Sequence, residues 1–174
     1  MPGPSPSGPT LALAFDFGRR RIGMAVGSTF TGSAVPLKTA AMLSAGPDWN
    51  AIDREVRARQ PHVLVVGVPY NEDGAAGPMA LAARGFAREL GARFGLPVAE
   101  VDEHGSSLEA QSMLRERRAD GRMNRRVQKQ DIDSAAAAII LMRWLAAPAT
   151  PRDNSRDDIP RDSSRADEQG TTAR

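Results

Sequence analysis

The chain has 174 residues, a formal net charge of +2 at pH 7, two histidines and no cysteine. This length predicts one domain with a sizeable core, and the lack of cysteine excludes disulfides and thiolate-bound metals. Because two histidines are too few for a histidine-based zinc site, any catalytic metal should be Mg²⁺ or Mn²⁺ held by oxygen ligands. The sequence has neither a secretory signal nor an apolar run approaching about 18 residues, so we expect a cytoplasmic protein with no membrane span.

Hydrophobic patterning predicts alternating strands and helices. An apolar run at 11–17, which contains Asp16 near its end, is typical of a strand in the middle of a sheet. A second strand at 21–28 follows after so short a turn that the two must be antiparallel, and a weaker strand is expected at 33–38. The remaining predicted elements are a helix from Asp48 to Gln60, a strand at 63–68, a helix from Met79 to Phe94, a strand at 97–102, a helix from Ser106 to about Arg117 and a last helix at 131–147.

This order of elements predicts an α/β fold with a mixed five-stranded sheet and helices on both faces. We expect the folded domain to span 11–147. Residues 1–10 are rich in Pro, Gly and Ser, and 148–174 carry five arginines against six acids with almost no large apolar residue. Neither segment can offset its ordering entropy by burial, so both are predicted to be disordered.

Basic residues are concentrated around the connection between the last two predicted helices. The stretch 115–129 contains seven basic residues against two acids. The basic residues are Arg115, Arg117, Arg118, Arg122, Arg125, Arg126 and Lys129. A local excess of this size is typical of a surface that faces phosphates, but a solvated loop in an arginine-rich chain would have the same composition. Composition alone leaves both interpretations open.

Acidic residues stand at the ends of several predicted elements. They are Asp16 in the first strand, Asp102 and Glu103 after another strand, and Asp131 and Asp133 at the start of the last helix. In a sheet of this order such ends can converge on one edge, where carboxylates could bind one or two hard cations and activate water for attack on a phosphodiester. Each acid also has a structural explanation, since Asp133 is favoured by the dipole of a first helical turn. Ser106 and Glu109 likewise form a predicted capping box.

Four segments, in order, resemble the motifs of one protein family. The segment Phe15-Asp16-Phe17-Gly18-Arg19-Arg20-Arg21-Ile22-Gly23-Met24-Ala25-Val26-Gly27 strongly resembles the opening motif of the RuvX/YqgF family. Members of this family are Holliday-junction-resolvase-like proteins that are also described as pre-16S rRNA nucleases. The segment 66–74 is similar to the second motif, Asp102-Glu103 stand where the family has Asp-Glu-Arg-Leu, and Lys129, Asp133 and 135–138 resemble its closing helix.

The resemblance implies an RNase H-like fold and a divalent metal, with Asp16, Glu103 and Asp133 as catalytic and metal-binding positions. Asp102 remains a rival to Glu103 as the catalytic acid, because adjacent strand residues face opposite sides of a sheet. His104-Gly105 depart from the family pattern by replacing Arg-Leu. This change removes a planar, permanently charged phosphate ligand, so a cost to phosphate binding or turnover is expected rather than a cost to the fold.

The function implied is a metal-dependent nuclease that processes the 5′ end of precursor 16S ribosomal RNA. Its expected partners are nucleic acid and ribosomal particles, and it is expected to act as a monomer or homodimer. The candidate nucleic-acid-binding residues are Arg20, Arg21, Asn71, Ser106, Arg122, Arg125, Arg126 and Lys129. Two alternatives are a Holliday-junction resolvase acting on branched DNA, which an obligate dimer would favour, and a non-catalytic nucleic-acid- or ribosome-binding factor with the same fold.

Overall fold

A computed structural model describes residues 10–71, 74–122 and 126–146 of the chain. The strands are β1 (Leu11–Phe17), β2 (Arg21–Ser28), β3 (Ser33–Pro36), β4 (Ala40–Leu43), β5 (Gly46–Pro47), β6 (Val63–Val68) and β7 (Val98–Asp102). The helices are α1 (Trp49–Arg59), α2 (Pro78–Phe94), α3 (Ser106–Ala119) and α4 (Lys129–Ala146). The termini predicted to be disordered lie outside the described residues, apart from Thr10, whose N–H donates to Thr29 Oγ1 over 2.8 Å.

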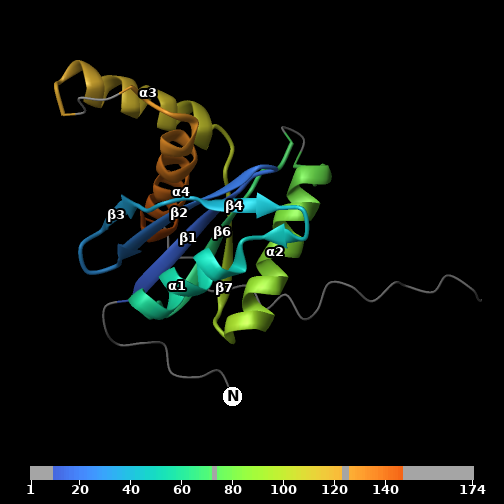
Figure 1. Cartoon of the computed structure of the whole chain (residues 1–174). Helices are drawn as coiled ribbons and strands as arrows, with labels where there is room; N and C mark the ends of the chain where they lie inside the picture. The colour runs from blue at the N-terminus through green and yellow to red at the C-terminus, as the bar shows by residue number, and fades with distance from the viewer. Residues whose placement is uncertain (1–9, 72–73, 123–125, 147–174) are drawn as a thin grey trace, which may run out of the picture.

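The sheet is mixed, with strand order β5-β4-β2-β1-β6-β7 and β3 paired to β2. Strand β1 runs antiparallel to β2 and parallel to β6, and β6 runs parallel to β7. The carboxyl ends of β1, β6 and β7 therefore meet at one edge of the sheet (Figure 1). This is the edge at which the sequence places its acidic residues.

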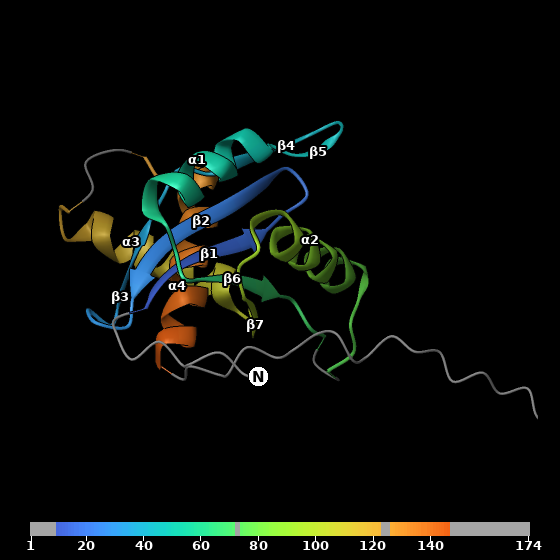
Figure 2. The same cartoon turned by 90° about the horizontal axis from the view of Figure 1, so that it is seen from below.

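Helices cover both faces of this sheet, as predicted. Helices α1 and α2 pack on the face that carries Leu13, Phe15 and Val66, and α4 packs on the face that carries Ala12 and Ala14 (Figure 2). Helix α3 packs mainly on α4, through Ala110 and Leu114, and projects away from the sheet (Figure 1). Within the described ranges, no helix combines the length and apolar character needed to cross a bilayer.

The sheet contains seven strands, so the predicted count of five was too low. Strands β4 and β5 were missed because they are short and consist of residues such as Ala, Gly and Pro, which give no strand pattern. The strand predicted at 33–38 ends at Pro36, and the chain resumes its pairing with β2 at Ala40. Proline cannot donate a ladder hydrogen bond, and the pairing is interrupted at this point.

The predicted capping box at the start of α3 was wrong. Gly105, at a φ of 74°, is the N-cap residue, and it makes no side-chain capping bond. Ser106 is the first helical residue and is buried, while the Glu109 carboxylate is engaged by Arg143 over 2.8 Å. The Glu109 carboxylate therefore pairs with the Arg143 guanidinium of α4. In a capping box it would have accepted a backbone N–H at the start of α3.

Candidate active site

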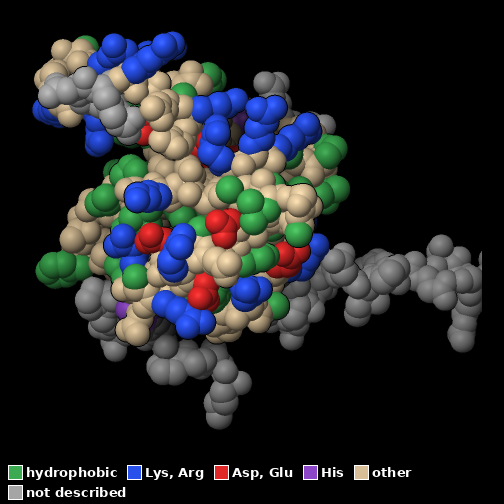
Figure 3. Space-filling view, viewed as in Figure 1, with side chains coloured by type: hydrophobic (Ala, Val, Ile, Leu, Met, Phe, Trp, Pro, Cys, Tyr) green, Lys and Arg blue, Asp and Glu red, His purple; other side chains and the backbone are tan. Residues whose placement is uncertain are grey.

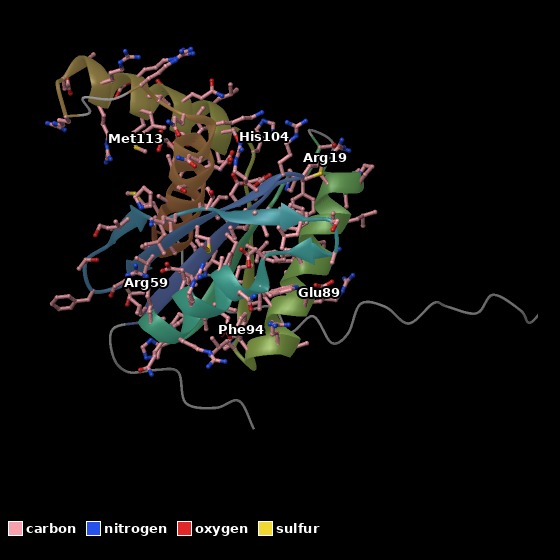
Figure 4. The ribbon with its side chains drawn as sticks, viewed as in Figure 1. Arg19, Arg59, Glu89, Phe94, His104 and Met113 are labelled. Atoms are coloured by element: carbon pink, nitrogen blue, oxygen red, sulfur yellow. The ribbon has the colours of Figure 1, made fainter. Side chains whose placement is uncertain are left out.

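Two carboxylates, Asp16 from β1 and Glu103 just after β7, meet at the carboxyl edge of the parallel strands. Asp16 pairs with Gly67 of β6, and the Glu103 N–H donates to Val68 O, the next residue of β6, over 3.2 Å. The end of β6 therefore holds the backbone of both acids in place. The labelled residues Arg19 and His104, which neighbour these acids in sequence, lie at this same edge (Figure 4). The fold thus brings together acids that are 87 positions apart in the sequence.

Burial and mutual repulsion make these two acids hard to ionise. Burial raises the pKa of Asp16 to about 6; a hydrogen bond with Glu103 opposes this shift and the charge of Asp133 adds to it. Burial also raises the pKa of Glu103 to about 8, with a further contribution from the charge of Asp16. Near neutral pH the environment of the pair therefore favours one retained proton, shared in the hydrogen bond between the Asp16 and Glu103 side chains.

Asp133 joins this pair from α4, and a glycine makes its approach possible. Gly23 is the β2 partner of Asp16, and a Cβ at Gly23 would overlap the backbone carbonyl of Asp133. Helix α4 can therefore lie against the sheet only because this position has no side chain. The carboxylate of Asp133 accepts a 2.8 Å hydrogen bond and ion pair from Arg21 Nε, which fixes its direction.

A second glycine gives Glu103 its place. A Cβ at Gly67 would stand 2.7 Å from Glu103 Oε2 and would also overlap the side chain of Ile140. Glu103 Oε2 is buried and has no hydrogen-bond partner among the described residues. An acidic oxygen in this state is costly to bury, so its environment favours a proton or a cation at that atom.

Arg143 is a residue of this site that the sequence reasoning missed. Its Nη1 donates to the carbonyl oxygens of Asp102 and His104, over 3.2 and 3.1 Å, and its Nη2 pairs with Glu109. These bonds hold the backbone on both sides of Glu103, and the charge of Arg143 lowers the pKa of that acid. A permanently charged guanidinium from α4 therefore stands beside the acidic pair, although position 104 is a histidine.

Asp102, the rival to Glu103, lies differently. It is exposed, and its Oδ1 accepts the N–H of His104 over 3.0 Å, which makes it a turn residue. Ser106, predicted to bind nucleic acid, is 2% exposed, and its N–H donates to Glu103 O over 2.9 Å. A buried serine in the first turn of α3 supports the Glu103 backbone through this bond, and a contact between Ser106 and nucleic acid stays a prediction.

The other predicted nucleic-acid-binding residues that the structure describes lie on the surface. Arg20 is exposed in the turn after β1, and Asn71 is exposed in a turn where Gly74 N–H donates to its carbonyl oxygen over 2.8 Å. Arg122 and Arg126 are exposed between α3 and α4, and Lys129 is exposed as the first residue of α4. Arg125 lies outside the described residues. Figure 3 shows Lys and Arg side chains gathered over α3 and over this sheet edge.

The residues present suit a hard divalent cation in their chemistry, although their arrangement is not that of a finished metal site. Within the described ranges, no three acidic or histidine side chains stand in a geometry ready to hold a metal ion. Asp16 and Glu103 instead share a proton, and Asp133 is paired with Arg21. Three carboxylates, raised pKa values for Asp16 and Glu103, and an unpartnered buried oxygen on Glu103 are nevertheless what an oxygen-binding cation would stabilise.

The raised pKa values predict that the cation-free protein is less stable at higher pH. In the unfolded chain Asp16 and Glu103 ionise near pH 4, whereas in the folded protein they retain protons up to about pH 6 and about pH 8. The free energy of unfolding should therefore be highest below about pH 4 for these groups and should fall by a few kcal/mol as pH rises to about 8. Urea denaturation in EDTA measures this. The Glu103→Gln variant should lose most of the dependence, and an equal pH dependence in both proteins would contradict the assignment.

Known proteins resemble this chain over most of its length. Residues 10–147 match the RuvX family, which is described as Holliday junction resolvase. A Xanthomonas oryzae pv. oryzae protein named "Putative pre-16S rRNA nuclease" is 44% identical over 136 residues, which cover 78% of this chain and 87% of that protein. A relative of the same name from Edwardsiella ictaluri is 43% identical over 137 residues, 79% of this chain and 95% of its own.

A solved structure supports the fold independently of sequence. The T. thermophilus RuvC in complex with Holliday junction substrate superposes with a TM-score of 0.51, covering 82% of this chain and 99% of that chain at 14% identity. At this identity the likeness concerns the RNase H-like fold alone. The match over 10–147 and the identity to its relatives together place the chain in the RuvX family, to which it belongs.

Proposed function

We propose that this protein is a divalent-metal-dependent nuclease that hydrolyses phosphodiester bonds in structured nucleic acid and processes the 5′ end of precursor 16S ribosomal RNA. The observation that supports it most is the pair formed by Asp16 at the end of β1 and Glu103 after β7, whose pKa values are both raised, with the charge of Asp133 on α4 adding to the shift of Asp16. Perturbed acids at the carboxyl edge of a sheet are typical of catalytic rather than structural positions. The names of the relatives supply the RNA substrate.

Each residue of the site has a role in this proposal. Asp16, Glu103 and Asp133 would hold Mg²⁺ or Mn²⁺, which supplies an activated water and offsets the charge that develops on the phosphate. Arg21 orients Asp133 through their 2.8 Å ion pair. Arg143 acts as a positioning residue, because it fixes the carbonyls on both sides of Glu103.

Holliday-junction cleavage is the second candidate, because the matching family is described as Holliday junction resolvase. The same carboxylates would serve either substrate, but a junction has two strands to cut symmetrically and needs two active sites. The resolvase reading therefore requires a dimer that places two copies of Asp16 on opposite strands. A monomer in solution would favour the RNA substrate.

The proposal is tested with two labelled substrates in parallel. The full-length protein is incubated with a 5′-extended 16S rRNA fragment and with a four-way DNA junction, in Mg²⁺ or Mn²⁺ and in EDTA. We expect cation-dependent cleavage of the RNA at its 5′ extension. Cleavage confined to the junction would support the resolvase, and no cleavage of either substrate despite tight binding would make the protein a binding factor.

The exposed basic residues between α3 and α4 should contact phosphates without reading sequence. Replacing Arg122 and Arg126 by Ala should weaken binding about equally for unrelated RNA sequences, because phosphate contacts carry no sequence information. The slope of log affinity against log salt concentration should fall by roughly one unit per lost contact. Arg57→Ala, an exposed residue paired with Asp53 on α1, is the matched control. An unchanged salt slope in the double variant would mean that Arg122 and Arg126 are solvated residues that do not contact phosphates.

A further inference from the structure

A β-bulge lies beside the candidate active site, between β3 and β4. Leu37 N–H donates to Met24 O over 2.8 Å, but pairing resumes with Ala40 opposite Ile22. Lys38 and Thr39 therefore both stand opposite the single residue Gly23. Bulges redirect side chains and are frequent next to active sites.

A cavity of about 670 Å³ opens at this bulge. Its walls are the bulge segment, the middle of α3 and the first two turns of α4. The lining residues are Pro36, Leu37, Lys38, Thr39, Met113, Leu114, Arg117, Gln130, Asp131, Ser134 and Ala135. Met113, labelled in Figure 4, belongs to the α3 wall. The volume lies within the range of pockets that hold small organic ligands.

The cavity is lined by both charged and apolar side chains. Lys38 from the bulge and Arg117 from α3 supply positive charge from two different walls, and Asp131 supplies the one negative charge of the lining residues. Leu37 and Met113 supply apolar surface. Two cations beside an apolar wall suit a ligand with an anionic group and a flat, weakly polar ring.

The cavity is joined to the candidate catalytic carboxylates through α4. Ser134 is buried, and its Oγ donates to Leu37 O over 2.6 Å, which fastens α4 to the bulge. The preceding residue, Asp133, packs its backbone on Gly23, which is the residue opposite the bulge. Asp133 and the cavity wall therefore belong to the same turn of α4. A nucleic-acid strand bound at Asp133 would pass close to the cavity.

We propose that this cavity binds one unpaired nucleotide of the strand that is cleaved, with its phosphate between Lys38 and Arg117 and its base against Met113. The inference rests on the proposed nuclease function and adds to it a requirement for single-stranded character beside the scissile bond. A base stacked in a duplex cannot enter such a cavity, so the nucleotide must leave the stack.

The test uses binding, so that its outcome does not depend on cleavage. The probes are a short RNA hairpin with a single-stranded 5′ extension that carries 2-aminopurine, and the same hairpin with a blunt end. Full-length Asp16→Asn protein serves as the background for both. Lys38→Ala and Arg117→Ala are compared with Arg118→Ala, which removes the same charge one residue along α3 but does not line the cavity. Thr39→Trp, with its melting temperature checked, fills the cavity.

We expect Lys38→Ala and Arg117→Ala each to weaken binding of the extended hairpin by about tenfold, and of the blunt hairpin by less than about twofold. Arg118→Ala should affect both hairpins alike, and Thr39→Trp should abolish the 2-aminopurine signal. Equal losses for Arg117→Ala and Arg118→Ala, or equal wild-type affinity for the two hairpins, would overturn the inference. Absence of cleavage by the wild-type protein would instead defeat the proposed function and leave these binding results standing.

Discussion

Replacing Asp16 by Asn is expected to lower the cleavage rate by at least about a thousandfold, or about 4 kcal/mol of transition-state stabilisation. Asp16 is hydrogen-bonded to Glu103, and the charge of Asp133 acts on it. Its replacement therefore removes the carboxylate that interacts with both of the other acids. The same change should raise the free energy of unfolding in EDTA, because a buried carboxylate is replaced by a neutral amide of similar shape. Single-turnover cleavage and urea denaturation measure the two effects.

Asp102→Asn is the matched comparison for this variant. It removes the same charge from a residue that is exposed and bonded to the His104 N–H. We expect its cleavage rate to stay within about tenfold of wild type, since a backbone hydrogen bond of ordinary strength is all that changes. An inactive Asp102→Asn protein together with an active Asp16→Asn protein would reverse the assignment of the site.

The second large effect is expected from Gly23→Ala. The added methyl group would overlap the backbone carbonyl of Asp133, and a backbone atom cannot move aside as the end of a flexible side chain can. Helix α4 must then shift away from β2, at a cost of about 1–3 kcal/mol in stability or more. Because the shift displaces Asp133, cleavage should fall by more than the loss of folded protein explains.

Gly85→Ala is the control for this variant. Gly85 lies inside α2, and a Cβ there would point into open space. This change should raise stability by about 0.5–1 kcal/mol and leave cleavage unchanged. Thermal melts and single-turnover rates distinguish the two glycines. A Gly23→Ala protein with wild-type stability and rate would mean that α4 does not need this close approach.

The elements that could be predicted from the sequence are those with strong burial patterns. Strands β1 and β6 are apolar on both faces, and their bounds were predicted without error. Strands β4 and β5 lie at the edge of the sheet, where few side chains are buried and no alternation develops. Their pairing with β2 and with each other depends on neighbours that the local sequence does not specify.

Part of the candidate site could also be predicted from the burial pattern of the strands. An acid at the end of a buried strand is conspicuous, which identified Asp16 and the pair Asp102-Glu103. The choice within that pair needed the structure, because it depends on which side chain faces Asp16. Arg143 could not have been found, because its place beside Glu103 comes from α4 crossing the end of β7 and leaves no local signal.

The two glycines beside Asp16 illustrate the same limit. Gly23 and Gly67 are visible in the sequence, but glycine in a strand has several explanations. Their role becomes clear only when the backbone of Asp133 and the side chain of Glu103 occupy the space that a Cβ would take. Tertiary contacts, rather than turn geometry, account for glycine at these positions.

The central claim is that the carboxylates around Asp16 and Glu103 bind a divalent cation, and calorimetric titration with Mn²⁺ tests it most directly. Titrations at pH 7 in two buffers of different ionisation enthalpy give both the affinity and the number of protons released. With the pKa of Glu103 at about 8, cation binding should release close to one proton. Glu103→Gln should weaken binding and release almost none. Absence of Mn²⁺ binding by the wild type at millimolar concentration, or equal affinity without proton release in both proteins, would contradict the account.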